Sequence, residues 1–114
     1  MWQLLQTNFL VQFSLFNPWR VEDIKLDNAP LSEDRLLGGR VRFRQPAGGY
    51  RVGSDSVLLA SAVPAVSGSR VLDLGAGVGA ASLCLAVRVA GCQIDAVELQ
   101  QELADIAVCN AGLN

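Results

Sequence analysis

Histidine is absent from this chain of 114 residues. Its absence excludes the commonest general base of enzymes and every Ser-His or Cys-His nucleophile arrangement. Cysteine is sparse: Cys84, Cys92 and Cys109 are odd in number and form no C-x-x-C pair. We therefore expect neither a disulfide framework nor a metal site, but free thiols in a reducing cytosol, and hence a cytoplasmic protein.

Long apolar runs are also lacking. No stretch approaches the roughly 18 apolar residues of a membrane-spanning helix. The apolar N-terminus has neither the basic region nor the small-residue cleavage site of a signal peptide. The sequence therefore predicts no membrane segment and no signal peptide.

The composition suits a packed core, because 51% of the residues are hydrophobic and 18% are charged. The length fits one domain of ordinary size. The net charge of −2 indicates no anionic partner, but five of the nine basic residues cluster with no acid between residues 35 and 54. This basic block consists of Arg35, Arg40, Arg42, Arg44 and Arg51.

Residues 1–31 differ in character from the rest of the chain and are predicted to be an apolar N-terminal extension and linker. The stretch 8–16 is apolar and partly alternating, and Asn17-Pro18 ends it, so it fits a strand or a short helix. It is expected to be an extension that packs on the domain or is poorly ordered, or else a segment that binds a partner. Residues 26–39 are predicted to be a polar linker in which Ser32 or Asp34 caps a short turn.

A hairpin and a lead-in helix are predicted over residues 32–69. Residues 40–44 alternate strictly, PAGG forms the turn, and residues 50–52 return. This places Val41 and Phe43 on one face. The opposite face carries Arg40, Arg42 and Arg44, and is either a solvated surface or a strip that contacts phosphates. A helix over residues 57–63 comes next, with Ser54 or Asp55 as its N-cap.

Residues 70–114 have the pattern of an α/β unit. We expect a buried strand at 70–75 (Val71, Leu72, Leu74), a glycine-rich turn at 75–79 and a helix at 79–90. A second strand at 93–98 and a helix at 100–111 complete the unit. Two parallel strands with their helices make half of a doubly wound fold. Because two such strands are marginal alone, we expect an N-terminal piece of a longer domain.

Two ligands compete for the glycine-rich turn. Gly75-x-Gly77-x-x-Ala80 fits the dinucleotide fingerprint, whereas Asp73 and Gly79 extend the pattern to D-x-G-x-G-x-G. A carboxylate at this point would repel a pyrophosphate but attract the cationic amino acid part of S-adenosylmethionine. Asp73 therefore favours S-adenosylmethionine, although it could instead cap the following helix.

Glu98 follows Gly79 by nineteen residues, at the end of the second strand. A carboxylate there can accept both hydrogen bonds of a ribose diol. The alternative is an exposed charge after a strand. The two acids at this spacing around three glycines favour a nucleoside site.

The strings VLDLGAGVG and IDAVELQ resemble the first two motifs of class I S-adenosylmethionine-dependent methyltransferases. Upstream, EDRLLGGRVRFRQPAGGYRVGSDSVLLASAV resembles the N-terminal region of small bacterial methyltransferases related to the tRNA adenine-N6 methyltransferases. The resemblance covers residues 32–114 and implies an α/β, Rossmann-like methyltransferase fold, of which this chain would hold the N-terminal half, preceded by the hairpin and helix.

The resemblance also implies a cofactor site and a partner. The cofactor would be S-adenosylmethionine and the partner RNA, with tRNA as the substrate and the arginine strip as a contact. The resemblance assigns the methionine part of the cofactor to the glycine-rich turn, the ribose to Glu98, the adenine to the next residue, and the cofactor's far end to the lead-in helix. The residues implied are Asp73, Gly75, Gly77, Gly79, Glu98, Leu99 and Asp55.

The family's N-P-P-aromatic motif, which holds the target amine, is missing; Asn17-Pro18-Trp19 is the nearest string and precedes the first motif. No catalytic residue is therefore predicted. Two alternatives stay open. One is a non-catalytic module that pairs with another chain, or with itself, through an unpaired sheet edge. The other is an NAD-binding fragment, which Asp73 disfavours.

Overall fold

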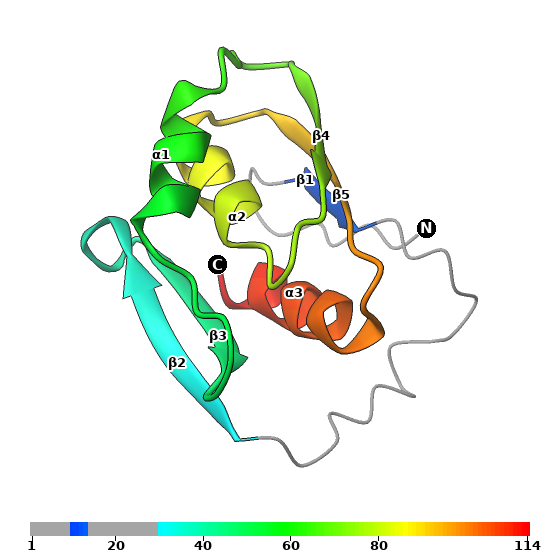
Figure 1. The fold of residues 1–114 in the computed structure, drawn as a ribbon. Coiled ribbons are helices and arrows are strands. Elements are labelled where there is room, and N and C mark those ends of the chain that lie inside the picture. The colour runs from blue at the N-terminus through cyan, green and yellow to red at the C-terminus, as the bar shows by residue number, and fades with distance from the viewer. Residues whose placement is uncertain (1–9, 14–29) are drawn as a thin grey trace.

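The structure is a computed structural model that describes residues 10–13 and 30–114. Figure 1 shows a parallel sheet, a separate hairpin and three helices packed around them. The elements in chain order are β1 (Leu10–Phe13), β2 (Leu31–Leu36), a 3-10 turn (Leu37–Gly39), β3 (Val41–Pro46), α1 (Ser54–Ala62), β4 (Arg70–Leu74), α2 (Ala80–Arg88), β5 (Gln93–Val97) and α3 (Gln101–Leu113).

The parallel sheet has the strand order β1-β5-β4. Strands β4 and β5 pair in parallel across the crossover helix α2, as predicted, with element ends within two residues of those expected. Strand β1 adds a third parallel strand on the other side of β5, with Leu10 opposite Gln93 and Phe13 opposite Ala96. The sheet therefore has three strands where the sequence predicted two. Within the apolar stretch 8–16, residues 10–13 are a strand, and the rest lies outside the described residues.

The hairpin differs from the one predicted. Strand β3 pairs with β2, from Leu31 opposite Pro46 to Leu36 opposite Val41, and not with residues 50–52. The prediction of a polar linker is therefore wrong over β2. Adjacent glycines explain the difference, because Gly38 and Gly39 adopt φ of 65° and 90° and form the tight connection.

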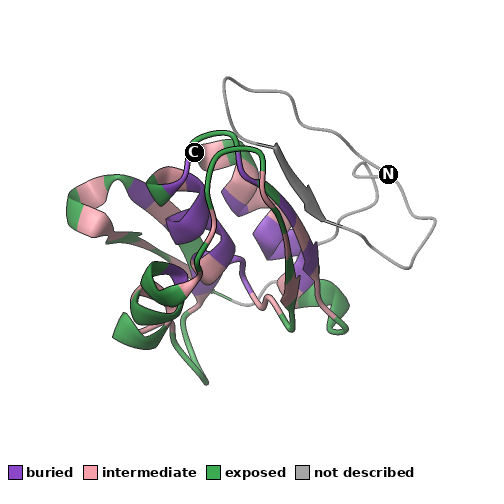
Figure 2. Cartoon of the chain, turned by 90° about the horizontal axis from the view of Figure 1, so that it is seen from above, coloured by how far each residue is buried: buried purple, intermediate pink, exposed green. Residues whose placement is uncertain are grey.

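The core lies between the hairpin, α2, α3 and β5, where Figure 2 shows the buried residues. Val41 and Phe43 are fully buried, as the alternation predicted, and share one cluster with Leu83, Ile94 and Ile106. Burial of these side chains, each worth about 2 kcal/mol, fixes the hairpin on the helical layer.

Only one face of β4 is covered by the described elements. Val71 and Asp73 line a small pocket with side chains of α1 and α2. Leu72 and Leu74 alternate with them along the strand and are 58% and 73% exposed, so the prediction that both are buried is wrong. A strand has a continuously apolar sequence when both of its faces are buried. In β4, the described residues cover only one face.

Helix α1 begins at Ser54 after Gly53, and no side chain caps it, so the predicted cap by Ser54 or Asp55 is wrong. The carboxylate of Asp55 instead accepts a hydrogen bond from the Tyr50 hydroxyl. None of the helices in the described part of the chain is long and apolar enough to cross a membrane.

Asn110 of α3 and Asn114, which follows the end of that helix, hold the outer edge of β3. Asn110 is fully buried; its side chain accepts from the Arg44 N–H (2.7 Å) and donates to the carbonyls of Arg44 (2.9 Å) and Val78 (2.8 Å). Asn114 makes the matching pair with the backbone of Arg42, at 2.8 and 2.7 Å. Helix α3 thus substitutes side-chain amides for a neighbouring strand, and Asn110 joins the hairpin to the loop that leads into α2.

Candidate functional site

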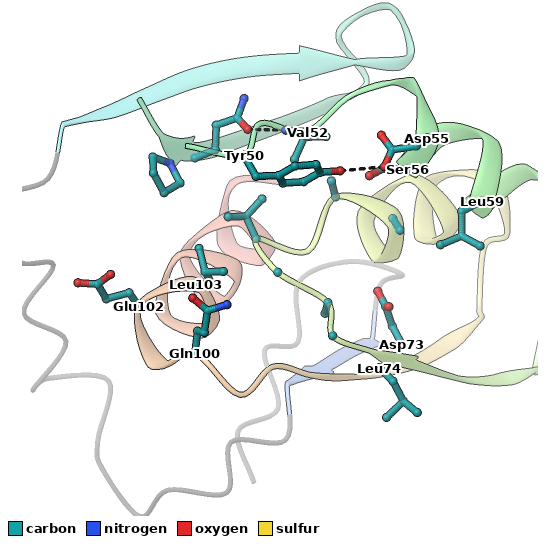
Figure 3. Close-up of a pocket in the computed structure, with 18 of the residues that line it drawn as sticks. Tyr50, Val52, Asp55, Ser56, Leu59, Asp73, Leu74, Gln100, Glu102 and Leu103 are labelled. Atoms are coloured by element: carbon teal, nitrogen blue, oxygen red, sulfur yellow. Dashed lines mark hydrogen bonds between the residues drawn. The ribbon is translucent and has the colours of Figure 1, made fainter. Parts of the chain in front are cut away.

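A pocket of about 690 Å³ opens between the hairpin side of the molecule and the carboxyl end of β4, as Figure 3 shows. Its volume lies within the range of small-molecule sites. One wall is the glycine turn, which we define as residues 75–79, with Asp73 before it and the start of α2 after it. The opposite wall is formed by Tyr50, Val52 and Asp55, and the start of α3 closes one end.

The glycine turn is fixed by backbone hydrogen bonds. The N–H groups of Gly75 and Ala76 both donate to the carbonyl of Val97, at 2.8 and 3.0 Å, so the turn wraps over the end of β5. Gly75, Gly77 and Gly79 have φ of 74°, 58° and 87°. A Cβ placed on Gly75 or Gly77 would meet no atom within 4 Å, so the backbone at both residues faces open space where a ligand can approach closely.

Asp73 lies in the pocket at the end of β4. The Ser82 hydroxyl, which is buried in α2, donates to its Oδ2 at 2.6 Å and orients the carboxylate. Asp73 therefore does not cap α2, whose N-cap is Gly79 without a side-chain hydrogen bond. Ser82 was not predicted from the sequence, because a serine inside an apolar helix gives no sign of its partner.

Glu98 follows β5 and reaches back to the glycine turn. Its carboxylate accepts from the N–H of Gly77 and from the N–H of Gln100, both at 2.8 Å. These backbone donors, with Gln100 the stronger, hold the pKa of Glu98 below its ordinary value of 4.5. Glu98 is thus a fixed, ionised acceptor beside the turn rather than an exposed charge.

The structure brings most of the predicted cofactor residues together. Asp55, Asp73, Gly75 and Gly77 line the pocket. Gly79 and Glu98 adjoin it through the turn and are not among the residues that line it. Leu99 also lies outside the lining and is 97% exposed.

Tyr50 and Asp55 form a hydrogen-bonded pair on the opposite wall. The Tyr50 hydroxyl donates to Asp55 Oδ2 at 2.8 Å, which raises the pKa of Tyr50 above 10.0 and lowers that of Asp55 below 3.8. Tyr50 was not predicted as a site residue, because the sequence placed it on a hairpin strand. The signal that could have found it is a solitary tyrosine between two glycine-containing stretches, just before a predicted site residue.

The charged side chains in the described lining of the pocket are all acidic. Among the described residues that line it, three are carboxylates (Asp55, Asp73 and Glu102) and none is a lysine or an arginine. A wall of this kind favours a cationic ligand and disfavours a polyanion. Within residues 10–13 and 30–114, no cluster of three or more histidine, cysteine or acidic side chains is arranged to hold a metal ion.

Of the three arginines in the predicted strip, only two share the outer face of the hairpin. Arg42 and Arg44 lie on the outer face of the hairpin, but both pair with Glu33, at 2.8 and 3.7 Å. Arg35 is directly across from Arg42 on the same face. Arg40 precedes β3 and donates to the carbonyl of Val87 in α2 instead. Five arginines against two acids within residues 31–51 still leave this side of the molecule basic.

A scan against protein-family models finds no match. Curated relatives, however, carry the name tRNA1(Val) (adenine(37)-N6)-methyltransferase. The one from Aeromonas hydrophila is 47% identical over 62 residues, which is 54% of this chain and 26% of the relative. The one from Erwinia tasmaniensis is 51% identical over 55 residues, 47% of this chain and 22% of the relative. The one from Yersinia pestis (strain Pestoides F) is 39% identical over 85 residues, 69% of this chain and 34% of the relative.

The chain therefore spans about a quarter to a third of the length of these relatives. Over that stretch it is homologous to proteins named as tRNA adenine-N6 methyltransferases, which confirms the resemblance predicted from its sequence.

Proposed function

We propose that this chain binds S-adenosylmethionine and forms the cofactor-binding part of a methyltransferase that acts on adenine N6 in tRNA or another nucleic acid. The observation that carries the proposal is the pocket itself. It combines an open glycine turn at the carboxyl ends of parallel strands with a lining in which the described residues supply three carboxylates and no basic side chain. That combination suits a nucleoside whose charge is positive, and the names of the relatives point to the same chemistry.

The residues present fit the cofactor. Asp73, oriented by Ser82, would accept from the ammonium of the methionine part, and Gly75 and Gly77 would leave room for that part to approach. Glu98, ionised and held beside the turn, would accept from the ribose hydroxyls. Leu99 would cover the adenine, and Asp55 would face the far end of the cofactor.

The bound cofactor supplies a methyl group on a sulfonium centre that is open to in-line attack by a nucleophile. The contribution of this chain is to position that centre, since the described residues of the pocket orient a ligand through carboxylates and backbone. With no N-P-P-aromatic motif in the sequence, activation of the acceptor amine is not assigned to this chain.

The same charge argument disfavours the NAD alternative. A dinucleotide would place a doubly anionic pyrophosphate at the start of α2. The Asp73 carboxylate accepts a hydrogen bond from Ser82 in the first turn of that helix, and Asp55 lines the same pocket. Repulsion from two acids would oppose a pyrophosphate there.

The outer hairpin face would contact RNA phosphates. Because Glu33 pairs with both Arg42 and Arg44, it limits how strongly they can bind an anion. Glu33→Gln is therefore expected to strengthen RNA binding and to steepen its salt dependence, whereas replacing Arg42 and Arg44 with glutamine is expected to weaken it. Filter binding at several salt concentrations measures both.

Calorimetric titration with S-adenosylhomocysteine and with NADH tests the proposal. We expect the chain to bind the first and not the second, and Asp73→Asn to weaken binding about tenfold, since a hydrogen bond between charged groups is worth roughly 1.5–3 kcal/mol. Asp95→Asn is the matched control: it removes a carboxylate of β5 that pairs with Arg70 outside the pocket. Preference for NADH, or equal losses in the two variants, would contradict the proposal.

The exposed face of β4 favours a second candidate, an interaction module. Leu72 and Leu74 are exposed there, next to a strand edge that is unpaired among the described residues. Pairing with a second copy of the chain would bury both leucines. Sedimentation at high concentration separates the two outcomes, because a monomer would exclude self-association and Leu74→Glu should dissociate an oligomer.

A further inference from the structure

Tyr50 is an exposed aromatic side chain at a pocket. Of the aromatic residues in the described part of the chain, Phe43 is buried in the core and Tyr50 is 78% exposed. Burial of an aromatic ring is strongly favourable, and one left open to solvent beside a ligand pocket has its faces available for a ligand. The cofactor roles proposed for the pocket do not use this ring.

The ring is also held in place from both ends. Its hydroxyl donates to Asp55 on α1 at 2.8 Å. On the backbone side, the Val52 N–H donates to Gln45 Oε1 at 2.8 Å, and the Arg51 guanidinium donates to Asp34 at 2.8 Å and to Ser32 at 3.0 Å. Residues 50–52 form no regular element, yet they are pinned to the hairpin by side chains. The aromatic platform is therefore pre-organised, which lowers the entropic cost of stacking a ligand on it.

The position of Tyr50 links the two regions that the proposed function needs. In Figure 3 the ring lies between the hairpin and the glycine turn, across the pocket from Asp73. The hairpin carries the exposed arginines Arg35 and Arg44 on its outer face. A nucleotide whose phosphates lie along the hairpin would thus reach the pocket past the tyrosine ring.

We propose that Tyr50 is a stacking platform for an unpaired RNA base at the entrance of the pocket, held by Asp55 so that the ring faces the incoming nucleotide. The inference rests on the proposed function, because it assigns the pocket to the cofactor and the hairpin to RNA. Stacking on an aromatic ring is the usual way to bind single-stranded bases. Asp55 then acts twice, as a carboxylate of the pocket and as the anchor of the ring.

A fluorescent base tests the proposal directly. The probe is a short single-stranded RNA that carries one 2-aminopurine, whose emission falls when it stacks. We expect the full chain to quench it. Tyr50→Phe keeps the ring but loses the hydrogen bond to Asp55, so it should retain the quench and bind about threefold more weakly than the parent. Tyr50→Leu should bind roughly fivefold or more weakly without quenching. Val66→Ala, which trims an exposed apolar side chain outside the pocket, is the control and should behave as the parent.

Titration of each variant with S-adenosylhomocysteine separates the inference from the proposed function. Retained cofactor binding by Tyr50→Leu, together with its weaker RNA binding, supports the platform. The platform is overturned if the parent does not quench the probe, if Tyr50→Leu binds RNA like the parent, or if that variant loses cofactor and RNA binding together. Failure of the proposed function would appear instead as a parent chain that binds no S-adenosylhomocysteine.

Discussion

The two walls of the pocket are built in different ways. The glycine-turn wall rests on backbone hydrogen bonds and on the apolar packing of α2 and β5, and its acids sit at strand ends. The hairpin wall, which consists of β2, β3 and residues 50–55, is anchored in the core by Val41 and Phe43. Side-chain hydrogen bonds add to this, from Gln45, Asp34 and Arg51 on one side and from Asn110 and Asn114 on the other.

The two walls should therefore respond differently to substitution. The backbone of the glycine-turn wall can be changed only through its glycines. Residues 50–52 of the hairpin wall are held by single side chains, so substitutions there can move this segment without altering the packed α/β unit. Substitutions in the hairpin wall can then change RNA binding while the glycine-turn wall still binds the cofactor. Substitutions in each wall test this independence.

The largest effect is expected at Asn110. Asn110→Ala removes three hydrogen bonds of a fully buried side chain and leaves backbone groups of Arg44 and Val78 unpaired, so the free energy of unfolding should fall by about 3 kcal/mol. Asn114→Ala also removes three hydrogen bonds, to the backbone of Arg42 and Asn110, but at an exposed position, and should cost less than about 1 kcal/mol. Urea unfolding measures both, and equal losses would contradict the assigned role of burial.

Gly77 tests the other wall. Gly77→Ala places a side chain at φ 58°, which should destabilise the fold by about 1 kcal/mol and weaken cofactor binding further, because the Cβ occupies open space at the pocket. Gly112→Ala in α3, where a Cβ meets nothing, should stabilise by about 0.5–1 kcal/mol and leave binding unchanged. A parent-like Gly77→Ala would show that the turn does not need its glycine.

The pH dependence of stability tests Glu98. Its pKa is lowered in the folded chain by the N–H groups of Gln100 and Gly77, so its contribution is present above the ordinary pKa of 4.5 and is lost as the pH falls through the lowered value. Glu98→Gln should therefore reduce stability by about 1 kcal/mol at neutral pH, and the gap should close only below pH 4.5. Unfolding curves at several pH values measure the gap; one that closes well above 4.5 would argue against the backbone contacts.

The smallest expected effect is a shift in the titration of Tyr50, which absorbance spectroscopy can follow. Tyr50 is the single tyrosine in the chain, so the tyrosinate absorbance reports it alone. The hydrogen bond to Asp55 raises the pKa of Tyr50, so ionisation should begin only at a pH above that of an ordinary tyrosine, for which the pKa is 10.0. Asp55→Asn should return the titration toward 10.0. Identical curves for the parent and the variant would show that the pair does not form in solution.

The sequence predicted the strands and helices of the glycine-turn wall because their signals are local. Alternating strand, glycine turn and apolar helix succeed one another along residues 70–114, and Asp73 and Glu98 stand at strand ends that the parallel topology brings to one edge. The burial of Leu72 and Leu74 was mispredicted because it depends on what covers the second face of β4.

The hairpin wall was mispredicted because its contacts are not local. Two glycine pairs, at 38–39 and 48–49, could each have closed a hairpin with the strand between them. The choice of the first depends on the ladder of β2 with β3 and on bonds from distant residues such as Asn110. The Tyr50–Asp55 pair was missed for the same reason, since it exists only once residues 50–52 leave the sheet.

The most direct test of the proposed cofactor site compares two ligands that differ only in the amino acid part. Affinities of S-adenosylhomocysteine and of 5′-methylthioadenosine are measured by calorimetry for the parent, Asp73→Asn and Glu98→Gln. We predict that the parent prefers S-adenosylhomocysteine by about tenfold or more, that Asp73→Asn removes this preference, and that Glu98→Gln weakens both ligands alike. A parent without preference, or an Asp73→Asn variant that keeps it, would contradict a pocket that holds the cationic end of S-adenosylmethionine at Asp73.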